Sequence, residues 1–167
     1  MFLQGKKLLN LPVAAMATQS KVGTVRKILV DPQGGRLIGF LVQQGFLAPG
    51  RVLSHHDVVS YDPQGLVVND PTNLLPIDDI VRAKEVMDQR IYILGMRAYT
   101  ESGKFLGRVT DFVLSTDIAM VVKYHVVGIL GLRILPAEKV VEISKKGVIF
   151  SDDVEEATVR GVAAEPA

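Results

Sequence analysis

The feature that most constrains the fold of this chain is an internal repeat. Residues 21–30 align with residues 105–114, which places Gly23 over Gly107 and Val25 over Val109. Three further blocks follow in the same order: residues 51–53 align with 133–135, 58–59 with 140–141, and 65–68 with 147–150. Between the first two blocks the second copy is two residues shorter, where a loop would tolerate the deletion. Four blocks in one order indicate a small domain written twice in tandem.

Each copy has the pattern of short β-strands. Runs of Val, Ile and Leu are bounded by Gly, Asp, Pro and Gln, with little helical periodicity. In the first copy they predict strands over residues 23–30, 37–43, 51–54, 58–61 and 66–69. Residues 31–35 predict a turn, because proline presets one φ angle and the two glycines accept positive φ. The spacing from Val25 to Ile28 breaks the strand alternation, and Val109 to Phe112 repeats the break, which predicts a β-bulge in each copy.

The segment between the copies has a helical pattern. Asp78 and Asp79 suit a helix N-terminus, and the apolar side chains that follow share one face: Ile80, Ala83, Val86 and Met87. The sequence allows this helix either to pack between the two domains or to bridge them. We therefore expect an all-β fold of two tandem small β-barrels joined by a short helical linker. The expected boundaries are 1–75 for the first barrel, 76–91 for the linker, 92–156 for the second barrel and 157–167 for a frayed tail.

Composition narrows the class of protein. The net charge is +1, from 19 basic and 18 acidic residues, and the basic pairs lack interleaved aromatics, so nucleic acid is not expected as a partner. The absence of cysteine excludes thiol chemistry and fits a reducing compartment. The longest uncharged run, residues 37–50, is too short and too rich in glycine for a membrane span. We expect a cytoplasmic protein without a membrane span, with peripheral attachment to a membrane complex left open.

No group of residues predicts catalysis. His55 and His56 are adjacent and followed by Asp57, but adjacent strand residues point to opposite faces, and the only other histidine is the distant His125. The chain has no cysteine, no nucleophile elbow and no glycine-rich phosphate loop. We expect a protein that is not an enzyme, with no catalytic residue, no metal and no cofactor. An enzyme of unknown type is the third alternative for the function.

Apolar residues recur at one equivalent place in the two copies. Phe46 and Leu47 precede Arg51, and a similar segment precedes Arg133, with Ile129, Leu130 and Leu132. A tip between two strands is ordinarily polar, so these side chains either pack against neighbouring structure or form a docking surface. We take Phe46, Leu47, Ile129, Leu130 and Leu132 as the candidate partner-binding residues.

Several of these segments resemble the PRC-barrel family. The segments are residues 8–13, 23–25 and 30–36, followed by 51–53 and 57–59. The resemblance covers roughly residues 5–70, and 94–153 through the repeat. The family includes the cytoplasmic part of the H subunit of the photosynthetic reaction centre and the C-terminal domain of a bacterial ribosome maturation factor. The second copy departs from the pattern at residues 115–119, where it lacks the glycine pair, and the first copy departs at residues 54–56.

The resemblance implies a function without implying a catalytic residue. Family members act mainly as adaptors that dock onto larger assemblies. We therefore expect a non-enzymatic interaction module, an adaptor or an assembly factor, with a photosynthetic membrane complex as the first expected partner. An adaptor in ribosome maturation or RNA processing is the alternative, and self-association is left open.

Overall fold

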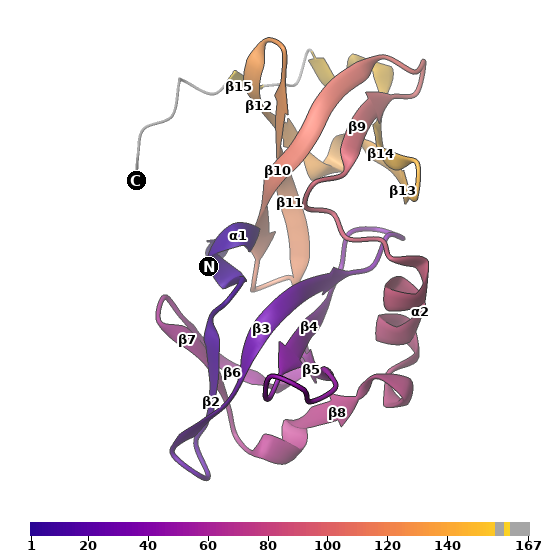
Figure 1. Ribbon diagram of the computed structural model, residues 1–167. Helices are drawn as coiled ribbons and strands as arrows, with labels where there is room; N and C mark the ends of the chain where they lie inside the picture. Colours follow the sequence, from indigo (N-terminus) through magenta and orange to yellow (C-terminus); the bar gives the residue numbers. More distant parts are fainter. Residues whose placement is uncertain (156–158, 161–167) are drawn as a thin grey trace. The chain divides into compact units, whose positions relative to one another are not determined.

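The computed structural model describes residues 1–155 and 159–160, in two compact units (Figure 1). The N-terminal unit consists of Gly5–Asp31 and Leu37–Arg90. The C-terminal unit consists of Met1–Gln4, Pro32–Arg36 and the described residues from Ile91 onwards. The predicted tail, 157–167, lies outside the described residues except for 159–160.

The N-terminal unit is built on a 7-stranded sheet in the order β6-β7-β2-β3-β4-β5-β8. Its strands are β2 (Pro12–Ala15), β3 (Ser20–Val30), β4 (Leu37–Gln43), β5 (Arg51–Ser54), β6 (Val58–Asp62), β7 (Gly65–Val68) and β8 (Leu74–Pro76). Neighbouring strands run antiparallel except β2 and β7, which pair in parallel. The five strands predicted for the first copy are confirmed, with shifts of a few residues at their ends.

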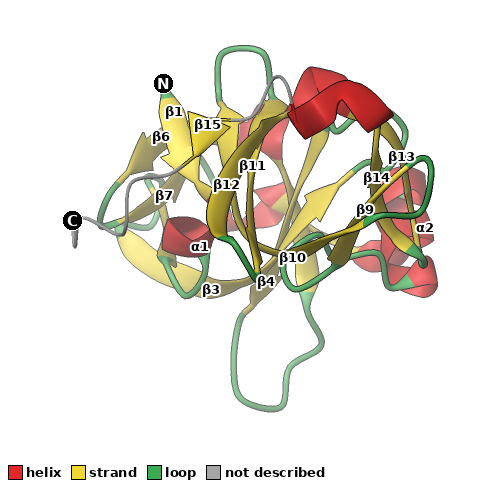
Figure 2. Cartoon of the chain, turned by 90° about the horizontal axis from the view of Figure 1, so that it is seen from above, coloured by secondary structure: helices red, strands yellow, loops and turns green. Residues whose placement is uncertain are grey.

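The C-terminal unit repeats this topology strand for strand. Its order is β13-β14-β9-β10-β11-β12-β15, with β1 added beside β10, and β14 and β9 form the parallel pair. The strands are β1 (Phe2–Gln4), β9 (Arg97–Thr100), β10 (Phe105–Ser115), β11 (Met120–Gly128), β12 (Gly131–Pro136), β13 (Val140–Ser144), β14 (Gly147–Phe150) and β15 (Val159–Arg160). The predicted all-β class with two like domains is confirmed, and strands dominate the chain in Figure 2.

Short helical segments connect the strands. The α-helices are α1 (Gly5–Leu8) and α2 (Val81–Gln89), and 3-10 turns span His55–Asp57, Pro71–Asn73, Ile77–Asp79, Ala137–Lys139 and Asp152–Glu155. Helix α2 is the helix predicted between the copies, and it packs on β3 and β4 of the N-terminal unit. Its buried side chains are Ala83 and Val86, and Arg82 forms an ion pair with Asp31 at the end of β3.

The predicted bulges lie at equivalent places in the two sheets. The register shifts between Val25 and Lys27 in β3, and between Val109 and Asp111 in β10. Because of the extra residue, Val25 and Ile28 both face the core, as do Val109 and Phe112. The cross-strand partner of Ile28 is Phe40, and that of Phe112 is Tyr124. The two units therefore share their registers as well as their strand order.

The turn after β10 carries strain that the turn after β3 avoids. Gly35 has a φ of 71°, whereas Ala119, at the equivalent place, has a φ of 50°. A Cβ disfavours this left-handed region by about 1 kcal/mol. Glycine would relieve this strain, but it would also add entropy to the unfolded chain, which offsets part of the gain. We therefore expect Ala119→Gly to raise the free energy of unfolding by about 0.5 kcal/mol. Urea unfolding measures this change. Ala98→Gly, at a buried position of the extended strand β9, is the matched control and should lower the free energy of unfolding. If Ala119→Gly lowered the free energy of unfolding by the same amount, Ala119 would not be strained.

Candidate functional site

The first apolar tip is the loop that joins β4 to β5 in the N-terminal unit. This loop projects beside β4 in Figure 2. Phe46 exposes 94% of its surface and Leu47 exposes 90%. The side-chain amide of Gln43 donates to the backbone carbonyl of Phe46 at 3.3 Å, which ties the loop to the end of β4. The two largest apolar side chains of the loop are therefore held out in solvent.

The second apolar tip is the turn that joins β11 to β12 in the C-terminal unit. Gly128 pairs with Gly131, so Ile129 and Leu130 form a two-residue hairpin tip. Ile129 is fully exposed, Leu130 is 78% exposed, and the neighbouring Val127 is 42% exposed. Leu132 is different, because it lies in β12 and is only half-buried. Of the five predicted docking residues, four thus lie on exposed tips and Leu132 lies in a strand beside one.

The two tips occupy the same place in the repeated topology. Each joins the third strand of the common motif, counted along the chain, to the fourth: β4 to β5 in one unit and β11 to β12 in the other. The first loop is longer, and this is where the aligned sequences differ by two residues. The repeat therefore places an exposed apolar tip on each unit.

A basic hollow adjoins the first tip. A depression of about 450 Å³ is lined by residues that include Lys21, Arg26, Gln43 and Phe46. The Arg26 guanidinium donates to the Gln43 side chain at 3.0 Å and to the Asn10 side chain at 2.9 Å. These bonds hold its positive charge beside the apolar loop. A partner that covers Phe46 can place a carboxylate next to Arg26 and Lys21.

The adjacent histidines lie in a capped turn. The Ser54 hydroxyl accepts a hydrogen bond from the His56 backbone N–H, and the two imidazole rings lie 3.9 Å apart. Burial, and then the nearby His56, lower the pKa of His55. Among the described residues, no group of three or more His, Asp or Glu side chains is arranged to hold a metal ion. The pair therefore offers an incomplete ligand set, even though the rings are close.

The acidic stretch that follows β14 is engaged by basic side chains of its own unit. Glu155 accepts from Lys104 at 2.7 Å and from Arg133 at 2.8 Å, and these bonds lower its pKa. Asp153 accepts from Lys139 at 2.8 Å, which likewise lowers its pKa. Both carboxylates are therefore held in the ionised form and tied to cations. This arrangement stabilises a surface network and gives no raised-pKa acid for catalysis.

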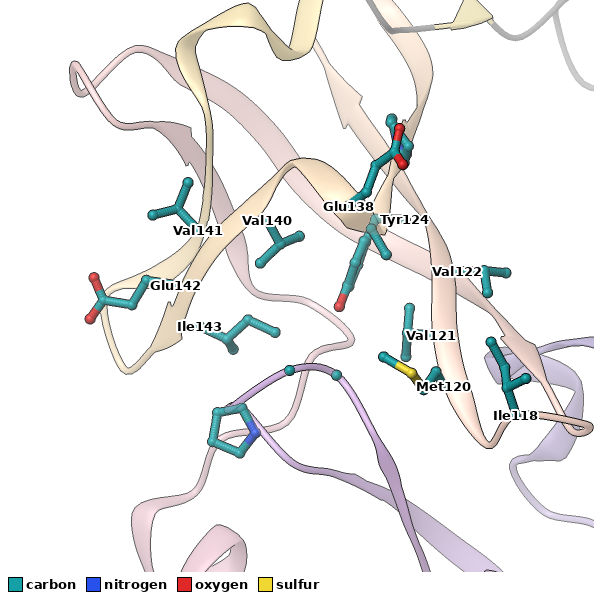
Figure 3. A pocket seen from close by; sticks show the side chains of 15 residues that line it. Ile118, Met120, Val121, Val122, Tyr124, Glu138, Val140, Val141, Glu142 and Ile143 are labelled. Atoms are coloured by element: carbon teal, nitrogen blue, oxygen red, sulfur yellow. The ribbon is translucent and has the colours of Figure 1, made fainter.

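A pocket in the C-terminal unit was not predicted from the sequence. It has a volume of about 640 Å³ and is walled by side chains of β11 and β13 and by the turn that contains Pro32, Gly34 and Gly35 (Figure 3). Tyr124 lies in it with its hydroxyl directed inward. The sequence contains a signal for this site, because extending the first aligned block at the same offset pairs Tyr124 with Phe40 and so marks a hydroxyl that only one copy carries there.

The N-terminal half of the chain matches a protein-family model. The PRC-barrel domain model matches residues 2–75, and no curated protein matches the chain in sequence. Among the described residues, no helix is both long enough and apolar enough to cross a membrane. The matched segment contains β2 to β7 and most of β8, whose strand order the C-terminal unit repeats outside the match. Residues 2–75 of this chain are therefore similar to the PRC-barrel domain.

Proposed function

We propose that this protein is a non-enzymatic adaptor or assembly factor that docks onto a partner protein through its two apolar tips. A PRC-barrel domain indicates a protein-interaction or assembly module. The docking surface consists of Phe46 and Leu47 on one unit and Ile129 and Leu130 on the other.

The exposure of the tips is the observation that supports the proposal. Leaving a Phe, Leu or Ile side chain in water forgoes about 1.5–3 kcal/mol of hydrophobic stabilisation for each residue. Phe46, Leu47 and Ile129 each expose at least 90% of their surface. Hairpin loops are ordinarily polar, and a small number of buried apolar anchors supplies most of the affinity of a typical interface. Exposed apolar side chains occur at equivalent places in both units, which favours a docking role over chance.

The charges beside the first tip narrow the chemistry of the partner. Lys21 and Arg26 lie in the hollow next to Phe46, so the complementary surface is an apolar groove with a carboxylate at its rim. We propose that the partner is a subunit of a membrane complex that presents such a groove to the cytoplasm. A photosynthetic complex is the first candidate. A ribosomal partner is the alternative, and the experiment below separates the two.

The test is site-specific photo-cross-linking in the organism that carries the chain. Benzoylphenylalanine replaces Phe46 in one variant and Ile129 in a second, and Val59, which is 51% exposed on β6, is replaced in the control. We expect both tip variants to form a cross-link with the same protein and the control to form none. Mass spectrometry of the product identifies a membrane-complex subunit or a ribosomal protein.

Serine substitutions then test the affinity with the purified partner. We expect Phe46→Ser/Leu47→Ser and Ile129→Ser/Leu130→Ser each to weaken binding at least tenfold, because each removes two apolar anchors. The free energy of unfolding should change by less than about 0.5 kcal/mol, as for exposed sites in general. Val59→Ser should bind like the parent chain. Cross-links only between copies of this chain, or tip-dependent binding to phosphatidylglycerol vesicles, would reject the adaptor in favour of self-association or membrane attachment.

A further inference from the structure

The pocket of the C-terminal unit contains a buried polar group that the fold does not use. Tyr124 is 1% exposed, and its ring meets Phe150 edge-on with 5.8 Å between centroids. Its hydroxyl points into the pocket, toward the turn that contains Gly35 (Figure 3). Burial alone raises the pKa of this hydroxyl, with no hydrogen bond contributing, so the group stays protonated at neutral pH. The hydroxyl is therefore a hydrogen-bond donor that opens onto the pocket.

The other copy shows that the barrel does not need this hydroxyl. Phe40 takes the place of Tyr124 in the N-terminal unit, with the same cross-strand register, and is fully buried. The phenyl ring of Phe40 thus fills the equivalent place in its core without any polar atom. The hydroxyl of Tyr124 therefore calls for an explanation other than folding.

The second difference between the copies concerns the space in front of this ring. In the N-terminal unit Tyr61, on β6, packs edge-on against Phe40 with 6.3 Å between centroids. The equivalent residue on β13 is Ile143, because Tyr61 pairs with Leu66 as Ile143 pairs with Val148. Ile143 lines the pocket beside Tyr124 (Figure 3). The C-terminal copy thus has the smaller Ile143 where the other copy has Tyr61, and it has Tyr124 where the other copy has Phe40.

The lining of the pocket determines what could occupy it. Aliphatic side chains of β11 and β13 form most of the wall, with Met120, Val121, Val140 and Ile143 among them. The ionisable carboxylates of the lining belong to Glu138 and Glu142, both exposed, and among the described residues no lysine or arginine lines the pocket. An anionic ligand would therefore meet repulsion and find no counter-charge. The volume of about 640 Å³ is within the range of small-molecule sites.

We propose that this pocket binds a neutral, mainly apolar small molecule whose carbonyl oxygen accepts a hydrogen bond from the Tyr124 hydroxyl. The aliphatic walls supply the affinity and Tyr124 selects a ligand that carries an acceptor. The site is independent of the apolar tips, so it goes beyond the adaptor function proposed above.

The test uses Prodan, an uncharged naphthyl ketone whose emission responds both to leaving water and to a hydrogen bond at its carbonyl. We expect saturable binding of one Prodan by the full chain. Tyr124→Phe should weaken it about tenfold, the loss expected for one hydrogen bond to a buried donor. Its bound emission should also shift to the blue, because the carbonyl loses its donor. Equal affinity and equal emission for this variant would overturn the role of the hydroxyl.

A second variant fills the pocket with the residue that the other copy uses. Ile143→Tyr should abolish Prodan binding while the circular dichroism spectrum stays that of the parent chain. If this variant folds and binds Prodan as strongly as the parent chain, the pocket is not the binding site. If it does not fold, the result for Tyr124→Phe tests the proposal instead. Phe46→Ser/Leu47→Ser should bind Prodan like the parent chain, which separates the pocket from dye adsorbed at an exposed tip. Anilinonaphthalene sulfonate, an anionic probe of similar size, should bind at least tenfold more weakly. Equal binding of that probe would reject the neutral ligand class.

Discussion

Gly107→Ala is expected to lower the free energy of unfolding of the C-terminal unit by about 3 kcal/mol. Gly107 lies in β10 with a φ of 136°, a backbone conformation that costs a residue with a side chain about 1–3 kcal/mol. A Cβ at this position would also press on the backbone carbonyl of Val127 and on the amide nitrogen of Gly128. These atoms belong to the neighbouring strand β11 and cannot rotate away as a side chain would.

Urea unfolding followed by near-ultraviolet circular dichroism measures this loss, and Gly103→Ala is its matched control. Gly103 has a φ of 92°, yet a Cβ added there meets no atom within 4 Å. Gly103→Ala should therefore show only the conformational cost of about 1 kcal/mol. If the two variants lose the same stability, close approach of the strands is not what requires glycine at position 107.

The repeat made most of the fold predictable. Gly23 aligns with Gly107, and a Cβ at Gly23 would also press on the adjacent strand, at the carbonyl oxygen of Gln43. The glycine is thus repeated because the two strands approach closely at the same point of each sheet. The bulges were predictable for a related reason, since the broken alternation of Val25 and Ile28 is a local property of one strand.

What the sequence could not supply depends on contacts between distant segments. The turn at residues 31–35 was predicted from proline and glycine, but the inclusion of Pro32–Arg36 in the C-terminal unit was not. Arg36 forms a β-bridge with Met120, and the carbonyl of Gly35 accepts from the Val121 N–H at 2.9 Å. Turn chemistry specifies dihedral angles and says nothing about which strand a turn will meet.

The candidate sites were predictable to different degrees. Apolar residues between strands identified the tips, but the pattern fits a packed loop as well as an exposed one, and only the accessibility of Phe46 and Ile129 distinguishes the two. The pocket was harder, because Tyr124 fits the alternation of a core strand as well as Phe40 does. Its hydroxyl becomes informative only once the space in front of it is known.

Phe112→Ala is expected to have an effect as large as that of Gly107→Ala, through a different cause. Phe112 follows the bulge of β10, is 1% exposed and pairs across the sheet with Tyr124. Removing a fully buried phenyl ring typically costs about 3–5 kcal/mol, from lost burial and from the cavity that remains. Hydrogen exchange of the β10 and β11 amides measures the loss, and the protection of these amides should fall accordingly.

Phe105→Ala is the control for this experiment, because it removes the same ring from the same strand. Phe105 is 51% exposed and touches Tyr99 with 5.5 Å between ring centroids, so its loss should cost about 1 kcal/mol or less. The difference between the two variants isolates burial from the intrinsic strand preference of phenylalanine. If Phe105→Ala lost as much stability as Phe112→Ala, burial in the core would not be what makes the ring at position 112 important. The aligned Ile28 and Phe112 would then have lost the structural role that the repeat assigns to them.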